Sequence, residues 1–258
     1  HNKYAQFARN EPVEARKNRL ERLRVWIHKN RPAIHEAMYT DFQKNATEVD
    51  AIEIFHVLAE ISHALKHLDS WAEPKKVDAP FTLFGTRSFI QYEPRGVCLI
   101  ISPWNYPFSL CLGPLVSALA AGNAVVLKPS ELTPNVSLVI RRLVDEIFDP
   151  AVVTAFTGGA EVSQALLTLP FDHIFFTGSP AVGRIVMKAA AENLASVTLE
   201  LGGKCPAIVA AKSRIRDAAK RIAFTKFLNN GQTCVAPDYV LVDEDIREHF
   251  VEELVTQI

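Results

Sequence analysis

The chain has 258 residues, enough for one large domain or two small ones. Hydrophobic residues make up 48% and charged residues 22%, which is typical of a globular protein and excludes a disordered or fibrous chain. With 28 Lys and Arg against 29 Asp and Glu, the formal net charge is −1. The basic excess that neutralises nucleic-acid phosphates is missing, so we expect a small molecule or a second copy of the protein as partner.

The N-terminal part, residues 3–72, is predicted to form helices. One of them carries an apolar stripe at steps of three and four residues, formed by Ile54, Leu58, Ile61, Leu65 and Leu68. Three histidines and a glutamate share the other side of this helix and resemble a metal site: His56, Glu60, His63 and His67. Because that side faces away from the stripe, we expect it to be solvated rather than to bind a metal.

From Glu73 to Arg95 the composition changes. Three prolines and Gly85 bracket a strand-like run at 88–92, which predicts an arm or linker outside the core. Between Val97 and Leu127 there is no charged residue, but the prolines within this stretch argue against a membrane-spanning helix.

Apolar strands alternate with helices from Val97 onward. Strands are predicted at 97–102, 124–127, 151–156, 173–176, 197–201, 206–210 and 239–242, and helices at 108–121, from 134, at 161–169, 180–194 and 214–228. This order predicts βαβ crossovers and a doubly wound α/β fold with a parallel sheet. Ligands of such sheets bind at the carboxyl ends of the strands, so the loops that follow the strands hold the candidate site.

The loop 177–184 lies between a strand and a helix. Gly178 and Gly183 have P-loop spacing, but Arg184 replaces the Lys that a P-loop needs. Ser179 as helix cap and Pro180 in the first turn leave a helix N-terminus that favours a pyrophosphate. An ordinary capped helix is the alternative interpretation.

Two further loops follow buried strands. In 128–131, Lys128 and Glu131 could bind the hydroxyls of a ribose, or the segment could be a solvated turn before a helix capped by Thr133. In 102–107, two prolines bracket Asn105, whose fixed amide could face an oxyanion. The alternative there is a rigid turn whose Trp104 packs in the core.

A carboxylate and a thiol complete the candidates. Glu200 ends a strand before two glycines and could act as a general base, unless it pairs with Lys204. Cys234 follows a polar loop at the end of a helix, where a thiol is accessible, and here the catalytic interpretation is favoured. Cys98, Cys111 and Cys205 lie in apolar segments and are expected to be buried. With no CxxC pair, the cysteines indicate a reducing, cytoplasmic location.

Five short motifs occur in order along the chain: Pro-Trp-Asn at 103–105, Lys-Pro-Ser-Glu at 128–131, Phe-Thr-Gly-Ser at 176–179, Glu-Leu-Gly-Gly-Lys at 200–204 and Gly-Gln-Thr-Cys at 231–234. Together they resemble the NAD(P)-dependent aldehyde dehydrogenases over most of the chain. The continuation Cys-Val-Ala-Pro-Asp-Tyr at 234–239 looks like the class 3 branch, which takes fatty, medium-chain and aromatic aldehydes.

The resemblance implies the catalytic roles. Cys234 would attack the aldehyde as a thiolate, and the Asn105 side chain with the Cys234 backbone N–H would hold the oxyanion. Hydride transfer to the nicotinamide would leave a thioester, and Glu200 would activate the water that hydrolyses it. Coenzyme A as acyl acceptor is an alternative, against which Glu200 argues.

The resemblance also implies the cofactor contacts. Lys128 and Glu131 would bind the adenosine ribose, Ser179 and its helix the pyrophosphate, and the small Gly178 and Gly183 would allow close approach. The predicted cofactor-binding set is completed by Trp104, Leu201 and Gly202. The cofactor is NAD or NADP; the Glu131 carboxylate repels a 2′-phosphate and so favours NAD, although class 3 enzymes often accept both.

The resemblance divides the chain into three parts. Residues 1–73 and 95–202 would form a Rossmann-like dinucleotide-binding domain, 74–94 part of an oligomerisation arm, and 203–258 the beginning of an α/β catalytic domain. We therefore expect a homodimer that acts on an aldehyde, with no nucleic acid, no membrane segment and no metal. The family's C-terminal half is not in this sequence, so we expect a longer native chain. A catalytically silent dinucleotide-binding fragment is the alternative function.

Overall fold

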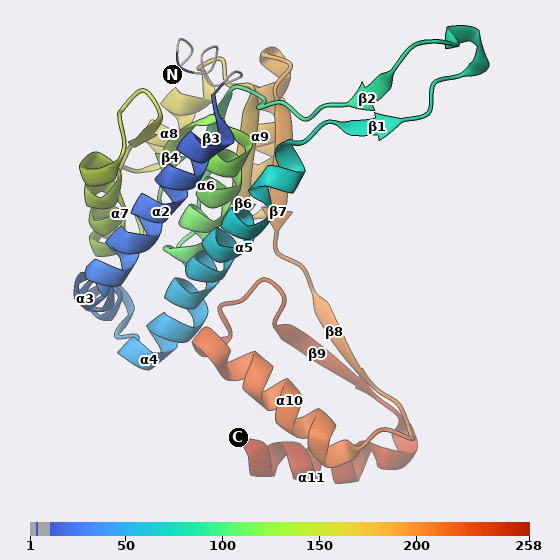
Figure 1. Ribbon diagram of the computed structural model, residues 1–258. Helices are drawn as coiled ribbons and strands as arrows, with labels where there is room; N and C mark the ends of the chain where they lie inside the picture. Colours follow the sequence, from blue (N-terminus) through green and yellow to red (C-terminus); the bar gives the residue numbers. More distant parts are fainter. Residues whose placement is uncertain (1–3, 5–10) are drawn as a thin grey trace. The chain divides into compact units, whose positions relative to one another are not determined.

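The structure, a computed structural model, describes residue 4 and residues 11–258. The described residues divide after Glu200 into two compact units, of which the second is residues 201–258. The first contains the N-terminal helices, a two-stranded hairpin and a five-stranded sheet with its helices (Figure 1). The second contains a two-stranded sheet and two α-helices.

The N-terminal segment is helical over residues 13–72, as predicted; positions 3 and 5–10 of the prediction lie outside the described residues. It comprises α2 (Val13–Lys29), α3 (Arg31–Phe42), α4 (Ala46–Val49), the π-helical turn η1 (Asp50–Ile54) and α5 (Phe55–Ala72). Ile54, Ile61 and Leu68 of the apolar stripe are buried, which confirms that the stripe faces the core. The π-helical turn was not predicted, because apolar spacing does not distinguish one turn of i→i+5 bonding from an α-helix.

The hairpin follows α5. Strand β1 (Lys75–Val77) pairs antiparallel with β2 (Ser88–Ile90), and the short 3₁₀ turn η2 (Phe81–Leu83) lies between them. The predicted strand at 88–92 is therefore two residues shorter. Phe81 and Phe84 are almost fully exposed, so this segment lies outside the core, as predicted.

The five-stranded sheet has the order β5-β4-β3-β6-β7. Its strands are β3 (Val97–Ile101), β4 (Ala124–Lys128), β5 (Val153–Ala155), β6 (His173–Gly178) and β7 (Ser196–Leu201). Strand β3 runs parallel to both β4 and β6, and β4 runs parallel to β5. The chain thus winds outward from β3 in both directions, which confirms the doubly wound fold. Its topological switch point lies between β3 and β6, where such folds bind ligands.

Helices cover both faces of this sheet. They are α6 (Ser109–Ala121), α7 (Pro134–Ile147), α8 (Ala160–Leu167) and α9 (Pro180–Glu192). Alternate strand residues enter opposite cores: Val125 and Leu127 pack with α2, α3, α5, α6 and α7, whereas Ala124 and Val126 pack with α8 and α9. Burial on both faces explains why β3 and β4 are apolar throughout.

Carboxylates from the N-terminal helices, rather than local residues, bind the first turns of α6 and α7. Thr133 occupies the N-cap position of α7 but makes no capping bond, so the predicted cap is wrong; its hydroxyl donates to the Ser130 carbonyl instead. The Asp41 carboxylate of α3 accepts hydrogen bonds from the backbone N–H groups of Asn135 and Val136. Long-range capping of this kind has no local sequence signal.

The second unit is one βαβ element with an additional helix. Strand β8 (Cys205–Val209) pairs parallel with β9 (Pro237–Val242), and α10 (Ile215–Phe227) connects them; the turns η3 (Leu228–Gly231) and η4 (Glu244–Ile246) and helix α11 (Arg247–Gln257) complete it. Val209, Ala219 and Phe250 form its small core. Across the described residues of both units, no helix is long and apolar enough to cross a membrane.

Candidate active site

Polar side chains gather at the switch point of the first unit. Ser102 follows β3 and is buried, and Thr177 lies near the end of the neighbouring β6. The Thr177 hydroxyl is buried and has no hydrogen-bond partner among the described residues. A buried hydroxyl without a partner costs free energy, which a ligand that binds at this edge would recover.

The segment from Ser102 to Phe108 joins β3 to α6 and carries Asn105. The Ser102 N–H donates to the Lys128 carbonyl at 3.1 Å and fixes the start of this loop beside β4. Trp104 is 39% exposed, so the alternative in which it packs in the core is wrong. Asn105 is partly exposed, as an amide that meets a ligand must be.

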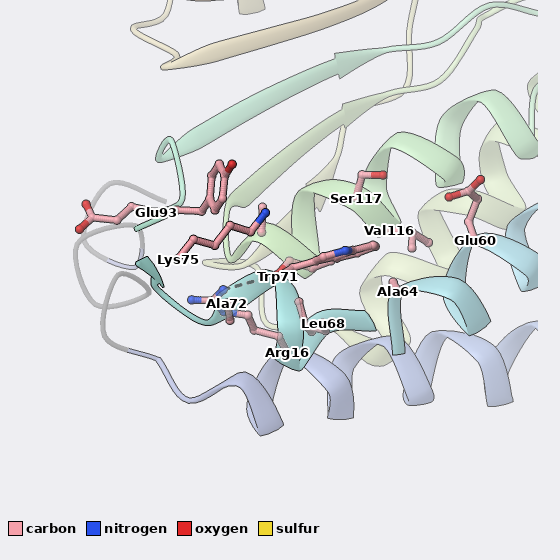
Figure 2. A pocket seen from close by; sticks show the side chains of 13 residues that line it. Arg16, Glu60, Ala64, Leu68, Trp71, Ala72, Lys75, Glu93, Val116 and Ser117 are labelled. Atoms are coloured by element: carbon pink, nitrogen blue, oxygen red, sulfur yellow. Dashed lines mark hydrogen bonds between the residues drawn. The ribbon is translucent and has the colours of Figure 1, made fainter. Parts of the chain in front are cut away.

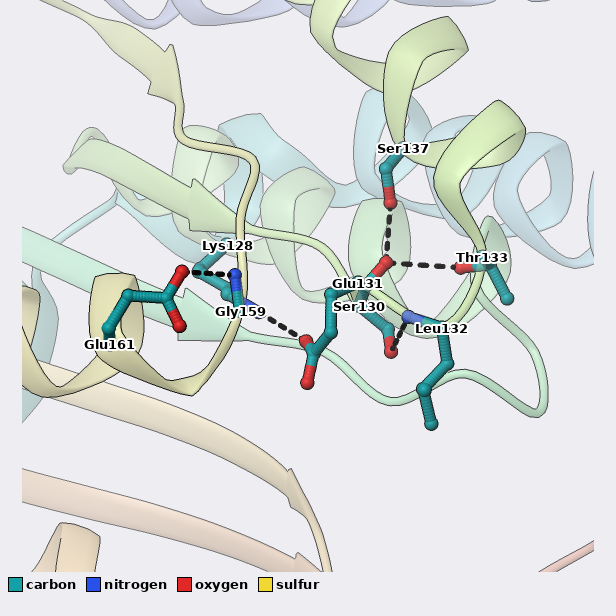
Figure 3. Close-up of polar contacts among 8 residues, drawn as sticks. All are labelled: Lys128, Ser130, Glu131, Leu132, Thr133, Ser137, Gly159 and Glu161. Carbon is teal, nitrogen blue, oxygen red and sulfur yellow. Dashed lines mark hydrogen bonds and ion pairs between the residues drawn. The ribbon is translucent and has the colours of Figure 1, made fainter.

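Lys128 ends β4 and is 2% exposed, which excludes the solvated turn proposed as the alternative. Its Nζ lies 2.6 Å from Oε2 of Glu131, whose side chain is about half exposed (Figure 3). Burial alone would raise the pKa of Glu131, but the hydrogen bond from Lys128 outweighs it and holds that pKa below its ordinary value. Glu131 is therefore an ionised acceptor at neutral pH, at the carboxyl end of a parallel strand.

The turn behind this pair is fixed by hydroxyl groups. Ser137 Oγ donates to the Ser130 carbonyl at 2.7 Å, and the Leu132 N–H donates to Ser130 Oγ at 3.3 Å (Figure 3). On the adjacent loop, the Glu161 carboxylate accepts from the Gly159 N–H at 2.9 Å. Side chains that are held by their neighbours keep Lys128 and Glu131 in place for a ligand.

The loop after β6 leads into α9. The Ser179 side chain accepts from the Val182 N–H at 3.3 Å, so the predicted cap is confirmed, and its O–H stays able to donate. A Cβ at Gly178 would lie 2.5 Å from the Phe176 ring, which explains the glycine. Gly183 is buried within the first turns of α9 and donates its N–H to the Ser179 carbonyl.

Glu200 and Leu201 end β7 and are exposed, as is Gly202. A Cβ at Gly202 or Gly203 would meet no atom within 4 Å, so there is free space around this segment. Lys204 Nζ lies 3.0 Å from Asp238 Oδ2. The sequence had offered Glu200 as the partner of Lys204, and in the structure Lys204 pairs with Asp238 instead.

In the second unit, Cys234 lies on a loop with unusual backbone geometry. Asn229, Asn230 and Gly231 have positive φ angles of 52°, 54° and 74° in succession. Asn and Gly tolerate this left-handed region best, and it turns the chain sharply at the end of α10. Asn229 is buried and its amide donates to the Gln232 carbonyl at 3.4 Å. The loop thus presents Cys234 on the surface.

The four cysteines, all within the described residues, are free thiols in different environments. Cys98 and Cys111 are buried, and burial raises the pKa of each to about 12. Cys205 is only partly buried, which corrects the expectation for that residue, and its Sγ donates to the Cys234 carbonyl at 3.5 Å. Cys234 alone among them is exposed.

Two cavities lie beside α6 in the first unit. One, of about 630 Å³, starts at its first turn and is lined by apolar groups that include Val57, Ile100, Leu110 and Phe175. The other, of about 340 Å³, lies at the base of the hairpin, where Figure 2 shows Trp71 with Arg16 and Lys75. None of the predicted site residues lines either cavity.

The first unit therefore has the features of a dinucleotide-binding α/β fold. The strand order, the unpartnered Thr177 hydroxyl at the switch point, the ionised Glu131 at a strand end and the exposed, Ser179-capped N-terminus of α9 fit a nicotinamide dinucleotide. The exposed thiol of Cys234 adds a nucleophile to the chain.

Comparison with known proteins identifies the family. The profile of the aldehyde dehydrogenase family matches residues 2–258, and the chain belongs to this family. The 4,4'-diaponeurosporen-aldehyde dehydrogenase of Staphylococcus aureus is 50% identical over 242 residues, covering 94% of this chain and 53% of that protein. The dimeric NADP-preferring aldehyde dehydrogenase of Mus musculus is 44% identical over 243 residues, covering 94% of this chain and 54% of that protein.

Solved structures agree. The substrate-bound state of Staphylococcus aureus AldH superposes with a TM-score of 0.96 at 47% identity, covering 99% of this chain and 56% of that chain. PnpE in complex with nicotinamide adenine dinucleotide has a TM-score of 0.89 at 28% identity, covering 99% of this chain and 52% of that chain. The predicted fold, family and cofactor class are confirmed, and the chain spans about half the length of the relatives that it matches.

Two features of the site were not predicted from the sequence. The polar Thr177 could have been found, since it lies near the carboxyl end of an apolar strand, where such folds bind ligands. The left-handed turn at 229–231 also has a signal, because the sequence Asn-Asn-Gly is enriched where φ is positive.

Proposed function

We propose that the protein oxidises an aldehyde to the carboxylic acid with NAD or NADP, with Cys234 as nucleophile. The observation that carries this proposal is the exposed thiol of Cys234 at the end of a sharply turned loop, in a chain whose other cysteines are buried or partly buried. A catalytic thiol must reach its substrate, and the other three are less accessible.

The proposed chemistry proceeds through a covalent intermediate. The Cys234 thiolate adds to the aldehyde carbon, and the Asn105 amide and the Cys234 backbone N–H stabilise the resulting oxyanion. A bound NAD or NADP would supply the hydride acceptor, and loss of hydride from this carbon would turn the thiohemiacetal on Cys234 into a thioester. Glu200 then removes a proton from water, which attacks the thioester and releases the acid and the free thiolate.

Cofactor binding is assigned to the first unit. Glu131 and Lys128 bind the adenosine ribose, Ser179 and the start of α9 bind the pyrophosphate, and Gly178 and Gly183 leave room for it. Trp104, Leu201 and Gly202 complete the site. In domain terms, 1–73 with 95–202 form the cofactor-binding domain, 74–94 belongs to an oligomerisation arm, and 203–258 begins the catalytic domain.

The proposal extends to substrate and assembly. The continuation Cys-Val-Ala-Pro-Asp-Tyr at 234–239, which resembles the class 3 branch, supports a fatty, medium-chain or aromatic aldehyde. The exposed aromatic residues of the hairpin support a homodimer formed through this arm. Free thiols at all four cysteines are compatible with the cytoplasm.

The test is NADH or NADPH formation by the complete protein with medium-chain and aromatic aldehydes. We expect turnover without coenzyme A, its loss in Cys234→Ala and its retention in Cys205→Ala, the matched control from the same unit. Cofactor binding without turnover by any aldehyde would contradict the proposal and would support a catalytically silent dinucleotide-binding protein.

A further inference from the structure

The first turn of α6 depends on a distant carboxylate. The N-cap residue of this helix, Phe108, is apolar and makes no side-chain cap. The Ser109 N–H donates instead to Oε2 of Glu53 at 2.9 Å. Glu53 comes from the π-helical turn η1, 56 positions earlier in the chain, and places its carboxyl group at the positive end of the helix. Burial raises the pKa of this carboxyl group, and Lys44 and the Ser109 N–H act in the opposite direction.

Glu53 is fully buried and is paired with an equally unusual lysine. Its Oε1 lies 3.2 Å from Nζ of Lys44, whose side chain is also buried. Lys44 Nζ in turn lies 5.4 Å from the centre of the Tyr106 ring, the residue next to Asn105. The pair therefore contacts the Asn105 loop at the ring of Tyr106 and the helix that follows the loop at the N–H of Ser109.

A buried ion pair is a costly way to stabilise a fold, because both charges lose their hydration. A π-helical turn is also uncommon, and such turns concentrate at functional sites. Here the turn and the pair converge on one loop. The other end of that loop is already held by the hydrogen bond from Ser102 to Lys128, and Pro103 and Pro107 restrict its backbone.

We infer that Glu53 and Lys44 are positioning residues that hold the 102–108 loop so that Asn105 can stabilise the oxyanion. The inference rests on the proposed function for the role of Asn105. Neither residue touches the reacting atoms; both act through the loop. A preorganised donor gives its full stabilisation only if it does not have to be ordered during the reaction.

The variants must avoid an unpaired buried charge, so each is made in a Lys44→Met background. Lys44→Met/Glu53→Gln keeps an acceptor for the Ser109 N–H, whereas Lys44→Met/Glu53→Leu removes it. Asp69→Asn is the control, because it breaks an exposed ion pair elsewhere among the N-terminal helices, between Lys17 of α2 and Asp69 of α5. Circular dichroism and thermal melting check that each variant folds.

The first measurement is amide hydrogen exchange, which needs no enzymatic activity. We expect exchange at the amides of 104–106 and 108–110 to rise at least about tenfold in the Leu variant, with a smaller change in the Gln variant and none in Asp69→Asn. Unchanged exchange at these amides in the folded Leu variant overturns the inference. This result shows whether the pair holds the loop even if no aldehyde is oxidised. The absence of oxidation would refute the proposed function and with it the role of Asn105, but not the hold on the loop.

The second measurement is a double-mutant cycle with Asn105→Ala in the active protein. We expect the Leu variant to lower kcat about tenfold or more, with little change in KM for the cofactor. In the Asn105→Ala background the same substitution should have no further effect. If the two effects multiply, Glu53 does not act through Asn105, and the inference is wrong.

Discussion

Both units of the chain contain parallel strands, but helices cover both faces of the sheet in the first unit and only one face in the second. Every residue of β3 and β4 is buried, with helices on both faces of the sheet. In the second unit, β8 and β9 bury one face against α10 and α11, while Ile208 and Leu241 on the strands are 75% and 52% exposed. The first unit is thus a rigid scaffold for strand-end side chains, and the second presents an accessible thiol on a small core.

Thiol reactivity should show the largest contrast between the units. With pKa values of about 12, Cys98 and Cys111 have a thiolate fraction of about one in ten thousand at pH 8, and burial restricts access further. We expect iodoacetamide to modify Cys234 at least about a hundredfold faster than either, as measured by peptide mass spectrometry. Unfolding in urea should remove the difference. Equal rates in the native protein would contradict the burial described for the first unit.

Core truncation is the next contrast. Leu99→Ala in β3 removes a fully buried side chain and should lower the free energy of unfolding by about 2–5 kcal/mol. Ile208→Ala in β8 removes a largely exposed one and should cost less than about 1 kcal/mol. Urea denaturation of both variants gives the comparison. A larger loss for Ile208→Ala would show that the outer face of β8 is covered in solution.

Glycine substitution sharpens the same comparison at the candidate site. A Cβ at Gly178 lies 2.5 Å from the Phe176 ring, whereas one at Gly202 meets nothing within 4 Å. Gly178→Ala should therefore destabilise by about 1–3 kcal/mol and weaken binding of the dinucleotide, while Gly202→Ala should change stability by less than about 0.5 kcal/mol. Calorimetric titration with NAD and thermal melting test both. Tolerance of alanine at Gly178 would mean that the Phe176 ring moves freely.

The smallest effect concerns helix caps. The Ser179 side chain caps α9, but Arg214 at the N-cap of α10 makes no capping bond. Ser179→Ala should cost about 1 kcal/mol of stability, and Arg214→Ala about 0.5 kcal/mol or less. Chemical denaturation measures this difference, provided that the dependence of the unfolding free energy on denaturant concentration is the same in both variants. The two losses being equal would remove the structural role given to Ser179.

Much of the fold could be predicted because its signals are local. The alternation of apolar strands with helices places β3, β4 and β6 within two residues of their bounds, and Ser179 followed by Pro180 marks the start of α9. The contacts that span long stretches of chain could not be predicted. Asp41 at α7 and Glu53 at α6 act across 94 and 56 positions, and no pattern near either helix announces them.

For the candidate site, sequence motifs identified the residue types but not their environments. The burial of Lys128, the exposure of Trp104 and the partner of Lys204 all follow from packing around the motif rather than from the motif itself. The exposed position of Cys234 was predicted, because a polar, glycine-containing loop at a helix end lies on the surface.

The most direct test of the central claim is to capture the covalent intermediate. The complete Glu200→Gln protein, incubated with NAD and a medium-chain aldehyde, should accumulate one acyl group as a thioester on Cys234, because the water that releases it lacks its base. Intact-mass and peptide analysis should show this acyl group on the Cys234 peptide, with a stoichiometric burst of NADH. A burst without acylation of Cys234, or an acyl group on another residue, would contradict the account.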